Sequence, residues 1–137
     1  MADSKLRVII ADDHKTIRRG LRFLLESEED IEVIGEASNG HEAVLLAREL
    51  HPTEMIIDIA MPETNGIEAM REILLELPDT KVLIISSESD RDAINDALAS
   101  GAAGYLSKGT SLLAVPFALR EIHRGSRFIS TGRAPWR

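Results

Sequence analysis

The sequence contains no cysteine and no long hydrophobic run. Without cysteine there is no disulfide framework and no thiolate metal site, and nothing requires an oxidising compartment. No apolar stretch approaches the roughly 20 residues that a membrane-spanning helix needs. Residues 1–5 lack the charged-then-apolar pattern of a signal sequence. These absences favour a cytoplasmic protein, and 137 residues fit one domain with a hydrophobic core.

An excess of basic residues is also absent, because the formal net charge is −7. This argues against nucleic-acid binding by this chain itself. The charge is uneven: residues 116–137 hold five arginines against one glutamate, whereas residues 1–115 carry a net charge of −11. The basic end is either a solvated last helix or a junction with a part that meets an anionic partner.

Short apolar runs of strand length alternate five times with segments of helical periodicity. The expected strands are Leu6–Ala11, Ile31–Ala37, Met55–Ile59, Val82–Ile85 and Gly104–Leu106. A helix follows each strand, the last from about Ser111 to Arg124, and residues 126–137 are expected as a poorly ordered tail or the start of a linker. Two Asn-Gly pairs, at 39–40 and 65–66, each open a helical pattern and indicate helix starts rather than hairpins. The predicted fold is α/β, a doubly wound parallel sheet of five strands with five helices.

Polar residues stand at four of the five expected strand ends, where ligands bind in open parallel sheets. They are Asp12 and Asp13 after the first strand, Asp58 at the third, Ser86 and Ser87 at the fourth, and Lys108 after the fifth. Taken alone, each has a plainer interpretation: the aspartates and serines as caps, and the lysine as a surface residue. Their coincidence at neighbouring strand ends favours a common site.

Three carboxylates in one crevice raise one another's pKa unless positive charge joins them. Mg²⁺ or Mn²⁺ is the natural partner for such oxygen ligands, and the ammonium of Lys108 adds a point charge. This set can also hold a phosphoryl group, which a carboxylate attacks to form an acyl phosphate. The hydroxyl of Ser86 can then donate a hydrogen bond to a phosphoryl oxygen.

Four segments resemble the receiver domain of two-component response regulators. They are VIIADDH (8–14), MIIDIAMPETNGIEAMREI (55–73), VLIISS (82–87) and GAAGYLSKG (101–109). The resemblance covers about residues 6–125 and gives a receiver domain at 1–125. It implies the flavodoxin-like fold with strand order 2-1-3-4-5.

The resemblance also implies a role for each matching site residue. Asp58 resembles the phosphoacceptor, and Asp12 and Asp13 resemble the acidic pair that positions Mg²⁺, with Asp13 as the direct ligand. The backbone carbonyl of Ala60 would complete the metal ligands with Asp58. Ser86, Ser87 and Lys108 would bind the phosphate. Ser86 and Tyr105 would form the switch, with the aromatic ring turning inward as the hydroxyl moves toward the phosphate.

The implied function is a phosphorylated switch rather than a turnover enzyme. A sensor histidine kinase would supply the phosphoryl group, and a homodimer could form through the fourth helix, the fifth strand and the last helix. The segments ADDH (11–14) and REIHRGSRFIS (120–130) look most like LuxR/NarL-type transcriptional regulators, whose DNA-binding domain follows such an ending. Either this chain is the receiver of such a regulator without that domain, or it is a free-standing receiver that acts on a protein partner.

Other classes fit the motifs less well. An aspartyl-nucleophile phosphohydrolase needs Asp-x-Asp after the first strand, where Asp12 and Asp13 are adjacent. A flavin or dinucleotide carrier needs a Gly-rich or hydroxyl-rich loop, where this chain has DDHKT (12–16). A receiver that works without phosphorylation is disfavoured because all the expected site residues are present. The departures from common receivers are the small Ala60, Gly109 after the lysine, and Pro116. The proline would either shift the start of the last helix or alter a surface that relatives use for dimer contacts.

Overall fold

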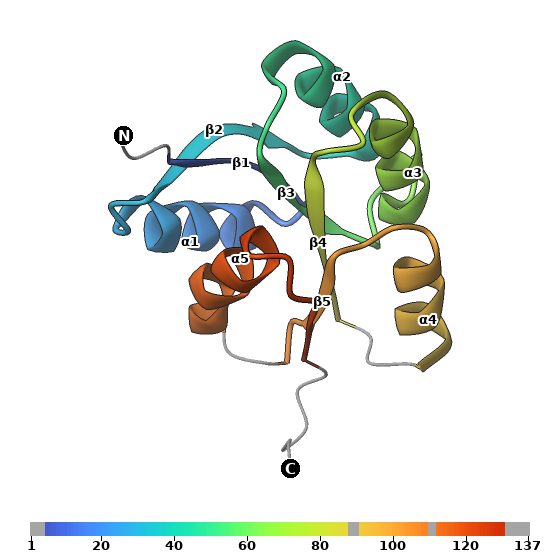
Figure 1. Ribbon diagram of the computed structural model, residues 1–137. Helices are drawn as coiled ribbons and strands as arrows, with labels where there is room; N and C mark the ends of the chain where they lie inside the picture. The colour runs from blue at the N-terminus through green and yellow to red at the C-terminus, as the bar shows by residue number, and fades with distance from the viewer. Residues whose placement is uncertain (1–4, 88–90, 110–111, 131–137) are drawn as a thin grey trace.

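Strands and helices alternate along the chain, described over residues 5–87, 91–109 and 112–130 of a computed structural model (Figure 1). The strands are β1 (Leu6–Ala11), β2 (Ile31–Ala37), β3 (Glu54–Asp58), β4 (Lys81–Ser86), β5 (Gly104–Ser107) and β6 (Phe128–Ser130). The helices are α1 (Lys15–Glu26), α2 (Gly40–Leu50), α3 (Gly66–Glu76), α4 (Arg91–Ala99) and α5 (Val115–His123). The predicted α/β class with five helices is confirmed. Within the described ranges, no helix is both long and apolar enough to cross a membrane.

All six strands are parallel and lie in the order β2-β1-β3-β4-β5-β6. The order implied for the first five strands is correct, but the expected count of five is wrong. The additional strand, Phe128–Ser130, pairs with β5 at the edge of the sheet. It lies in the segment expected as a tail, because three residues are too few to show strand periodicity. Residues 131–137 of that segment lie outside the described residues.

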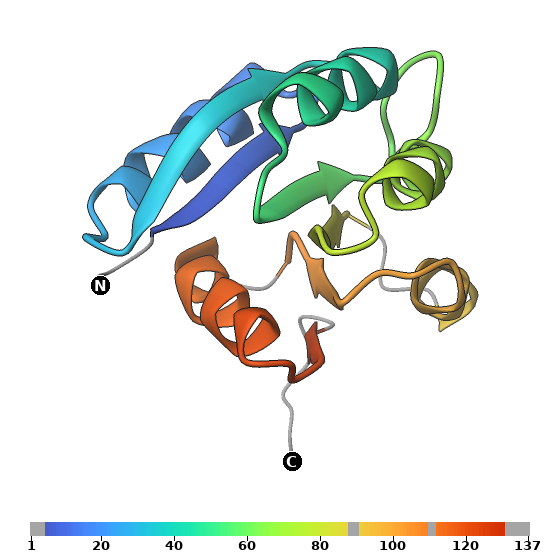
Figure 2. The same ribbon diagram turned by 45° about the horizontal axis from the view of Figure 1, so that its top comes forward.

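Two hydrophobic layers enclose the sheet. Figure 2 shows α1 and α5 on one face and α2, α3 and α4 on the other, with the strands between them. Because successive strand residues point to opposite faces, Ile56 of β3 joins the first layer, whereas Met55 and Ile57 join the second. Burial of both faces explains why the central strands are apolar at nearly every position.

Two helix starts follow from the Asn-Gly pairs, as predicted. The side chain of Asn39 accepts a hydrogen bond from the Glu42 backbone N–H at 2.8 Å, and Asn65 accepts one from Glu68 at 3.0 Å. Both asparagines are therefore N-caps. The last helix begins at Val115, after a 3₁₀ turn at Leu112–Ala114, and not near Ser111. Pro116 lies in its first turn, where the missing N–H costs no helical hydrogen bond.

One edge of the sheet gathers the carboxyl ends of the strands. The registers of β1 with β3, β3 with β4, and β4 with β5 bring the ends of these four strands level with one another. Helix connections lead away in opposite directions from β1 and β3, so a crevice opens between these two neighbours. The predicted site residues follow or end these strands.

Candidate functional site

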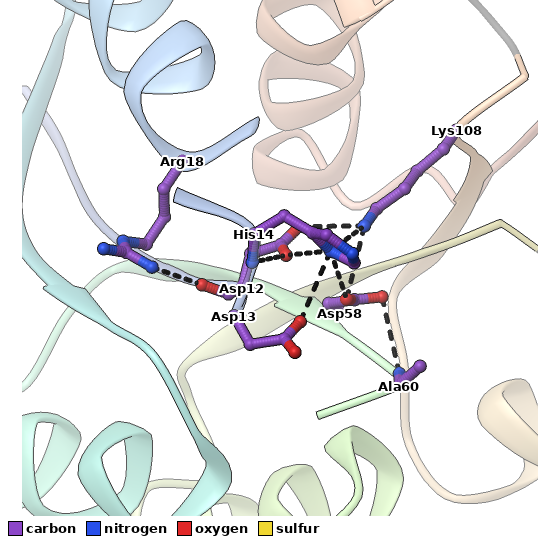
Figure 3. A network of polar contacts seen from close by, with 7 residues as sticks. All are labelled: Asp12, Asp13, His14, Arg18, Asp58, Ala60 and Lys108. Carbon is purple, nitrogen blue, oxygen red and sulfur yellow. Dashed lines mark hydrogen bonds and ion pairs between the residues drawn. The ribbon is translucent and has the colours of Figure 1, made fainter. Parts of the chain in front are cut away.

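Figure 3 shows side chains from three strand ends converging on one point. Asp12 and Asp13 follow β1, Asp58 ends β3, and Lys108 follows β5. β1 and β3 are neighbours paired through Ala11 and Ile57, which places the acidic residues after them side by side. Asp12 and Asp58 are buried, whereas the side chain of Asp13 is about one-third exposed.

The Lys108 ammonium bridges the two buried carboxylates. Its Nζ lies 3.2 Å from Asp58 Oδ2 and 3.1 Å from Asp12 Oδ2. The backbone N–H of Lys108 donates to the carbonyl oxygen of Ser86 at 2.7 Å, and this bond fixes the lysine at the end of β5. The structure thus brings together Asp12, Asp58 and Lys108, as their strand-end positions predict.

Ionisation of the Asp58 carboxyl group is unfavourable at this site. Burial and the charge of Asp12 raise its pKa, the Lys108 ammonium opposes both effects, and the resulting pKa is about 6. One ammonium faces the carboxylates of Asp12, Asp13 and Asp58, so the acidic charge at this point is not balanced by lysine alone. Additional positive charge would therefore stabilise the ionised carboxylates.

The residues present fit a divalent cation. Among the described residues, Asp12, Asp13, His14 and Asp58 each offer a ligand atom, and these atoms lie within 4.8 Å of one another. Oδ2 of Asp12 is buried, and its partner among the described residues is the Lys108 ammonium at 3.1 Å. Oxygen atoms of three carboxylates are the donors that a hard cation prefers. The role implied for Ala60 stays a prediction: its backbone N–H lies 3.4 Å from Asp58 Oδ1, and no contact tests its carbonyl oxygen.

The remaining predicted residues lie around this centre. Ser87, Ala60, Asp58 and Lys108 line a pocket of about 260 Å³ together with His14 and Ile17. Ser86 is buried at the end of β4, opposite Ser107 of β5. The ring of Tyr105 is fully buried and belongs to the hydrophobic layer that includes Ile94 and Ala97 of α4.

Two residues with clear places at the site had no predicted role. The ring of His14 contacts the carboxylates of Asp12 and Asp13, at 3.1 and 3.3 Å from its Nδ1. Its position directly after the aspartate pair is the sequence signal that could have indicated it. Gly66 is the other: a Cβ there would lie 2.1 Å from the carbonyl oxygen of Asp58, so only glycine fits against the end of β3. The Asn65-Gly66 pair predicted a helix start but not this close approach.

Known proteins share both the sequence and the fold. The sequence profile of the response regulator receiver domain matches residues 8–116. The chain is 41% identical to the transcriptional regulatory protein LiaR of Bacillus subtilis over 88% of this chain and 57% of that protein. It is 38% identical to the response regulator GacA of Pseudomonas protegens, over 91% of this chain and 59% of that protein.

Two solved structures are similar over almost the whole chain. A LuxR-family response regulator from Aurantimonas has a TM-score of 0.88 and 31% identity, covering 93% of this chain and 91% of its own. The signal receiver domain of NarL from Mycobacterium tuberculosis has a TM-score of 0.84 and 31% identity, with coverages of 90% and 99%. The chain belongs to the response regulator receiver domain family. Its relatives are LuxR/NarL-type response regulators, and it spans less than two thirds of the length of LiaR and GacA.

Proposed function

We propose that Asp58 accepts a phosphoryl group from a sensor histidine kinase, in a reaction that depends on Mg²⁺ or Mn²⁺. The observation that carries the proposal is the contact between Asp58 and Lys108. A buried carboxylate lies 3.2 Å from the Lys108 ammonium, at the edge of a parallel sheet where ligands bind. Such a carboxylate can act as a nucleophile while the ammonium stabilises charge on the incoming group.

In the proposed step, one oxygen of Asp58 forms a bond to phosphorus. The bond between phosphorus and the donor breaks, and its electron pair stays with the donor. Lys108 pairs with the phosphoryl oxygens, and the Ser86 hydroxyl donates a hydrogen bond to one of them. Asp12, Asp13, Asp58 and the carbonyl oxygen of Ala60 would hold the cation. When bound, that ion would supply positive charge that neutralises the phosphoryl oxygens.

The proposed conformational switch depends on the neighbours of Ser86 and Tyr105 in the fold. Movement of the Ser86 hydroxyl toward the phosphate would displace the end of β4 from its neighbour β5, which carries Tyr105. Because Tyr105 packs in the same layer as Ile94 and Ala97, the displacement would reach α4. Phosphorylation would then change the populations of two arrangements of α4 and β5 rather than drive catalytic turnover.

The proposed output is control of transcription in a longer protein, since LiaR is a transcriptional regulatory protein and this chain covers 57% of it. DNA would be bound by a further domain and not by the acidic receiver. A homodimer through α4, β5 and α5 is the proposed arrangement of the active form. A free-standing receiver that acts on a protein partner is the second candidate, favoured by the exposed apolar side chains of Leu113, in the turn before α5, and Phe117, on α5. The cytoplasmic location stays a prediction.

The test is incubation with acetyl phosphate, with and without Mg²⁺, followed by intact mass measurement. We expect one added phosphoryl group per chain, which depends on Mg²⁺ and is absent in Asp58→Asn. Lys108→Ala is expected to slow the reaction but to leave Asp58 able to accept the phosphoryl group. Asp79→Asn is the matched control, because Asp79 is exposed near the other end of the sheet.

Two results would contradict the proposal. One is an added phosphoryl group that persists in Asp58→Asn. The other is an unchanged mass in the wild-type protein with Mg²⁺ present. Steady hydrolysis of diverse phosphate esters would instead favour a phosphohydrolase. Sequence-specific DNA binding by this chain would contradict the proposal that a further domain, and not the receiver, binds DNA.

A further inference from the structure

Arg18 of α1 reaches the acidic site from the side opposite Lys108 (Figure 3). Its Nη1 donates a hydrogen bond to the backbone carbonyl oxygen of Asp12 at 2.7 Å. That carbonyl belongs to the peptide group that joins Asp12 to Asp13, the two acidic residues after β1. The arginine therefore holds the backbone between these two carboxylates.

This peptide group lies just beyond the paired part of the sheet. The registers of β1 with β2 and of β1 with β3 both end at Ala11. The backbone N–H of Asp12 still donates to the Ala37 carbonyl oxygen at 3.0 Å, but the Asp12 carbonyl points past the last paired residues. Because Asp12 is buried, its carbonyl needs a hydrogen-bond partner, and a charged donor makes the stronger bond. Arg18 thus supplies from α1 a constraint that strand pairing supplies to the residues before it.

Glu36 of β2 fixes the arginine in turn. Its Oε1 accepts a hydrogen bond from Arg18 Nε at 3.0 Å, and its Oε2 accepts one from Arg22 Nη1 at 2.6 Å. The hydrogen bonds from Arg22 and Arg18 lower the pKa of Glu36, although burial opposes the shift, so Glu36 stays ionised. The side chain of Arg18 is only 16% exposed, and its planar guanidinium connects α1, β2 and the residue after β1.

We propose that Arg18 is a positioning residue of the cation site, which orients the carboxylates of Asp12 and Asp13 by holding the carbonyl between them. This inference rests on the proposed function, because it concerns the same cation site. The direction of the effect separates positioning from charge. A guanidinium near a cation site opposes binding by Coulomb repulsion, so its removal would strengthen binding if charge alone mattered. Positioning predicts the opposite result, because misplaced ligands bind the ion more weakly.

Calorimetric titration with Mg²⁺ measures the affinity of the folded protein. In Arg18→Ala the Kd should rise roughly tenfold, at the low end of what the loss of a residue that orients metal ligands costs. Arg18→Lys keeps the charge but not the fork that reaches two oxygens, so its Kd should rise as well. This second variant carries the test if Arg18→Ala is too unstable to titrate. Arg22→Ala is the matched control: Arg22 binds the same Glu36 from α1, but its other hydrogen bond is to Glu26, and its loss should not raise the Kd.

Nuclear magnetic resonance of the protein without Mg²⁺ supplies a second readout. Loss of a hydrogen bond to a carbonyl oxygen changes the resonance of the amide nitrogen in the same peptide group. The amide nitrogen of Asp13 should therefore shift in Arg18→Ala and stay in place in Arg22→Ala. Urea unfolding in EDTA shows that each variant is folded under the conditions of the titration.

Two results would contradict the inference. Mg²⁺ binding that depends on Asp13 but is unchanged or tighter in Arg18→Ala and Arg18→Lys would overturn it and leave the proposed function standing. Mg²⁺ binding that Asp13→Asn does not weaken would place the ion elsewhere and overturn the cation site of both proposals.

Discussion

Glu54 is a buried carboxylic acid at the first position of β3. Its side chain is 1% exposed, and within the described part of the chain neither carboxylate oxygen has a hydrogen-bond partner. The nearest ion-pair contact is His123 Nδ1, 4.0 Å from Oε2. Burial raises the pKa of Glu54 to about 8, although the charge of Lys81 opposes the rise. Glu54 is therefore protonated in the folded protein at neutral pH.

This raised pKa predicts a loss of stability as the pH rises. Above its ordinary pKa near 4 the unfolded chain releases the Glu54 proton, whereas the folded protein keeps it until about pH 8. The free energy of unfolding should therefore fall between about pH 4 and pH 8 and level off above. Glu54→Gln has no such proton and should be more stable than the wild type by about 3 kcal/mol at pH 7.

Urea unfolding of both proteins at several pH values measures this difference. The raised pKa of Asp58 contributes equally to both, so the difference between the two curves isolates Glu54. Glu32→Gln, at an exposed position of β2, is the control and should change little. Parallel curves for wild type and Glu54→Gln between pH 5 and pH 8 would show that Glu54 is ionised in the folded state.

At the scale of the elements, two helical glycines occupy opposite environments. Gly20 lies on the exposed side of α1, and a Cβ there would meet no atom within 4 Å. Gly66 is the first residue of α3, and its N–H donates to the Ile59 carbonyl oxygen at 2.8 Å. Its close approach to the Asp58 carbonyl packs the start of α3 against the end of β3.

The two alanine variants are expected to change stability in opposite directions. Gly20→Ala should raise the free energy of unfolding by about 0.5–1 kcal/mol, because alanine loses less backbone entropy in a helix. Gly66→Ala should lower it by roughly 3 kcal/mol, at the upper end of the cost of overpacking, and should slow phosphorylation of Asp58. Urea unfolding and the intact-mass assay measure both effects, and equal stability of the two variants would contradict the close approach at Gly66.

For the whole molecule, the proposed cation binding would be linked to folding through the acidic edge of the sheet. The folded protein holds Asp12, Asp13 and Asp58 together, whereas the unfolded chain separates them and has no such site. A ligand that binds only the folded state stabilises it by mass action. A divalent cation bound at this edge would also relieve the cost of ionising Asp58 beside Asp12.

Mg²⁺ is therefore expected to increase the free energy of unfolding. At a concentration ten times its Kd the gain should be about 1.4 kcal/mol. Calorimetric melting at several Mg²⁺ concentrations measures the effect, and Asp13→Asn should require much more Mg²⁺ for the same rise in Tm. A rise that is equal in Asp13→Asn would show that the ion acts elsewhere, and NaCl at equal ionic strength controls for general screening.

Much of the fold was predictable because it depends on local patterns. Apolar runs of strand length between helical stripes predicted five parallel strands, and the Asn-Gly pairs predicted two helix starts. The short β6 was missed because three residues carry no periodicity. The start of β3 was placed at Met55 rather than Glu54, because a glutamate is unexpected in a strand that is buried on both faces.

Sequence patterns were enough to predict the fold class and which polar residues stand at the strand ends, and the receiver resemblance supplied the strand order. Side-chain contacts at those ends were decided by the tertiary structure. In the folded protein Lys108 lies between Asp12 and Asp58, and the ring of His14 contacts the carboxylates. The side chain of Glu54 is buried from water. The physical reason is that periodicity reports which face of an element is buried, whereas distances between residues far apart in the chain, and the pKa values that follow, arise only when the strands are paired.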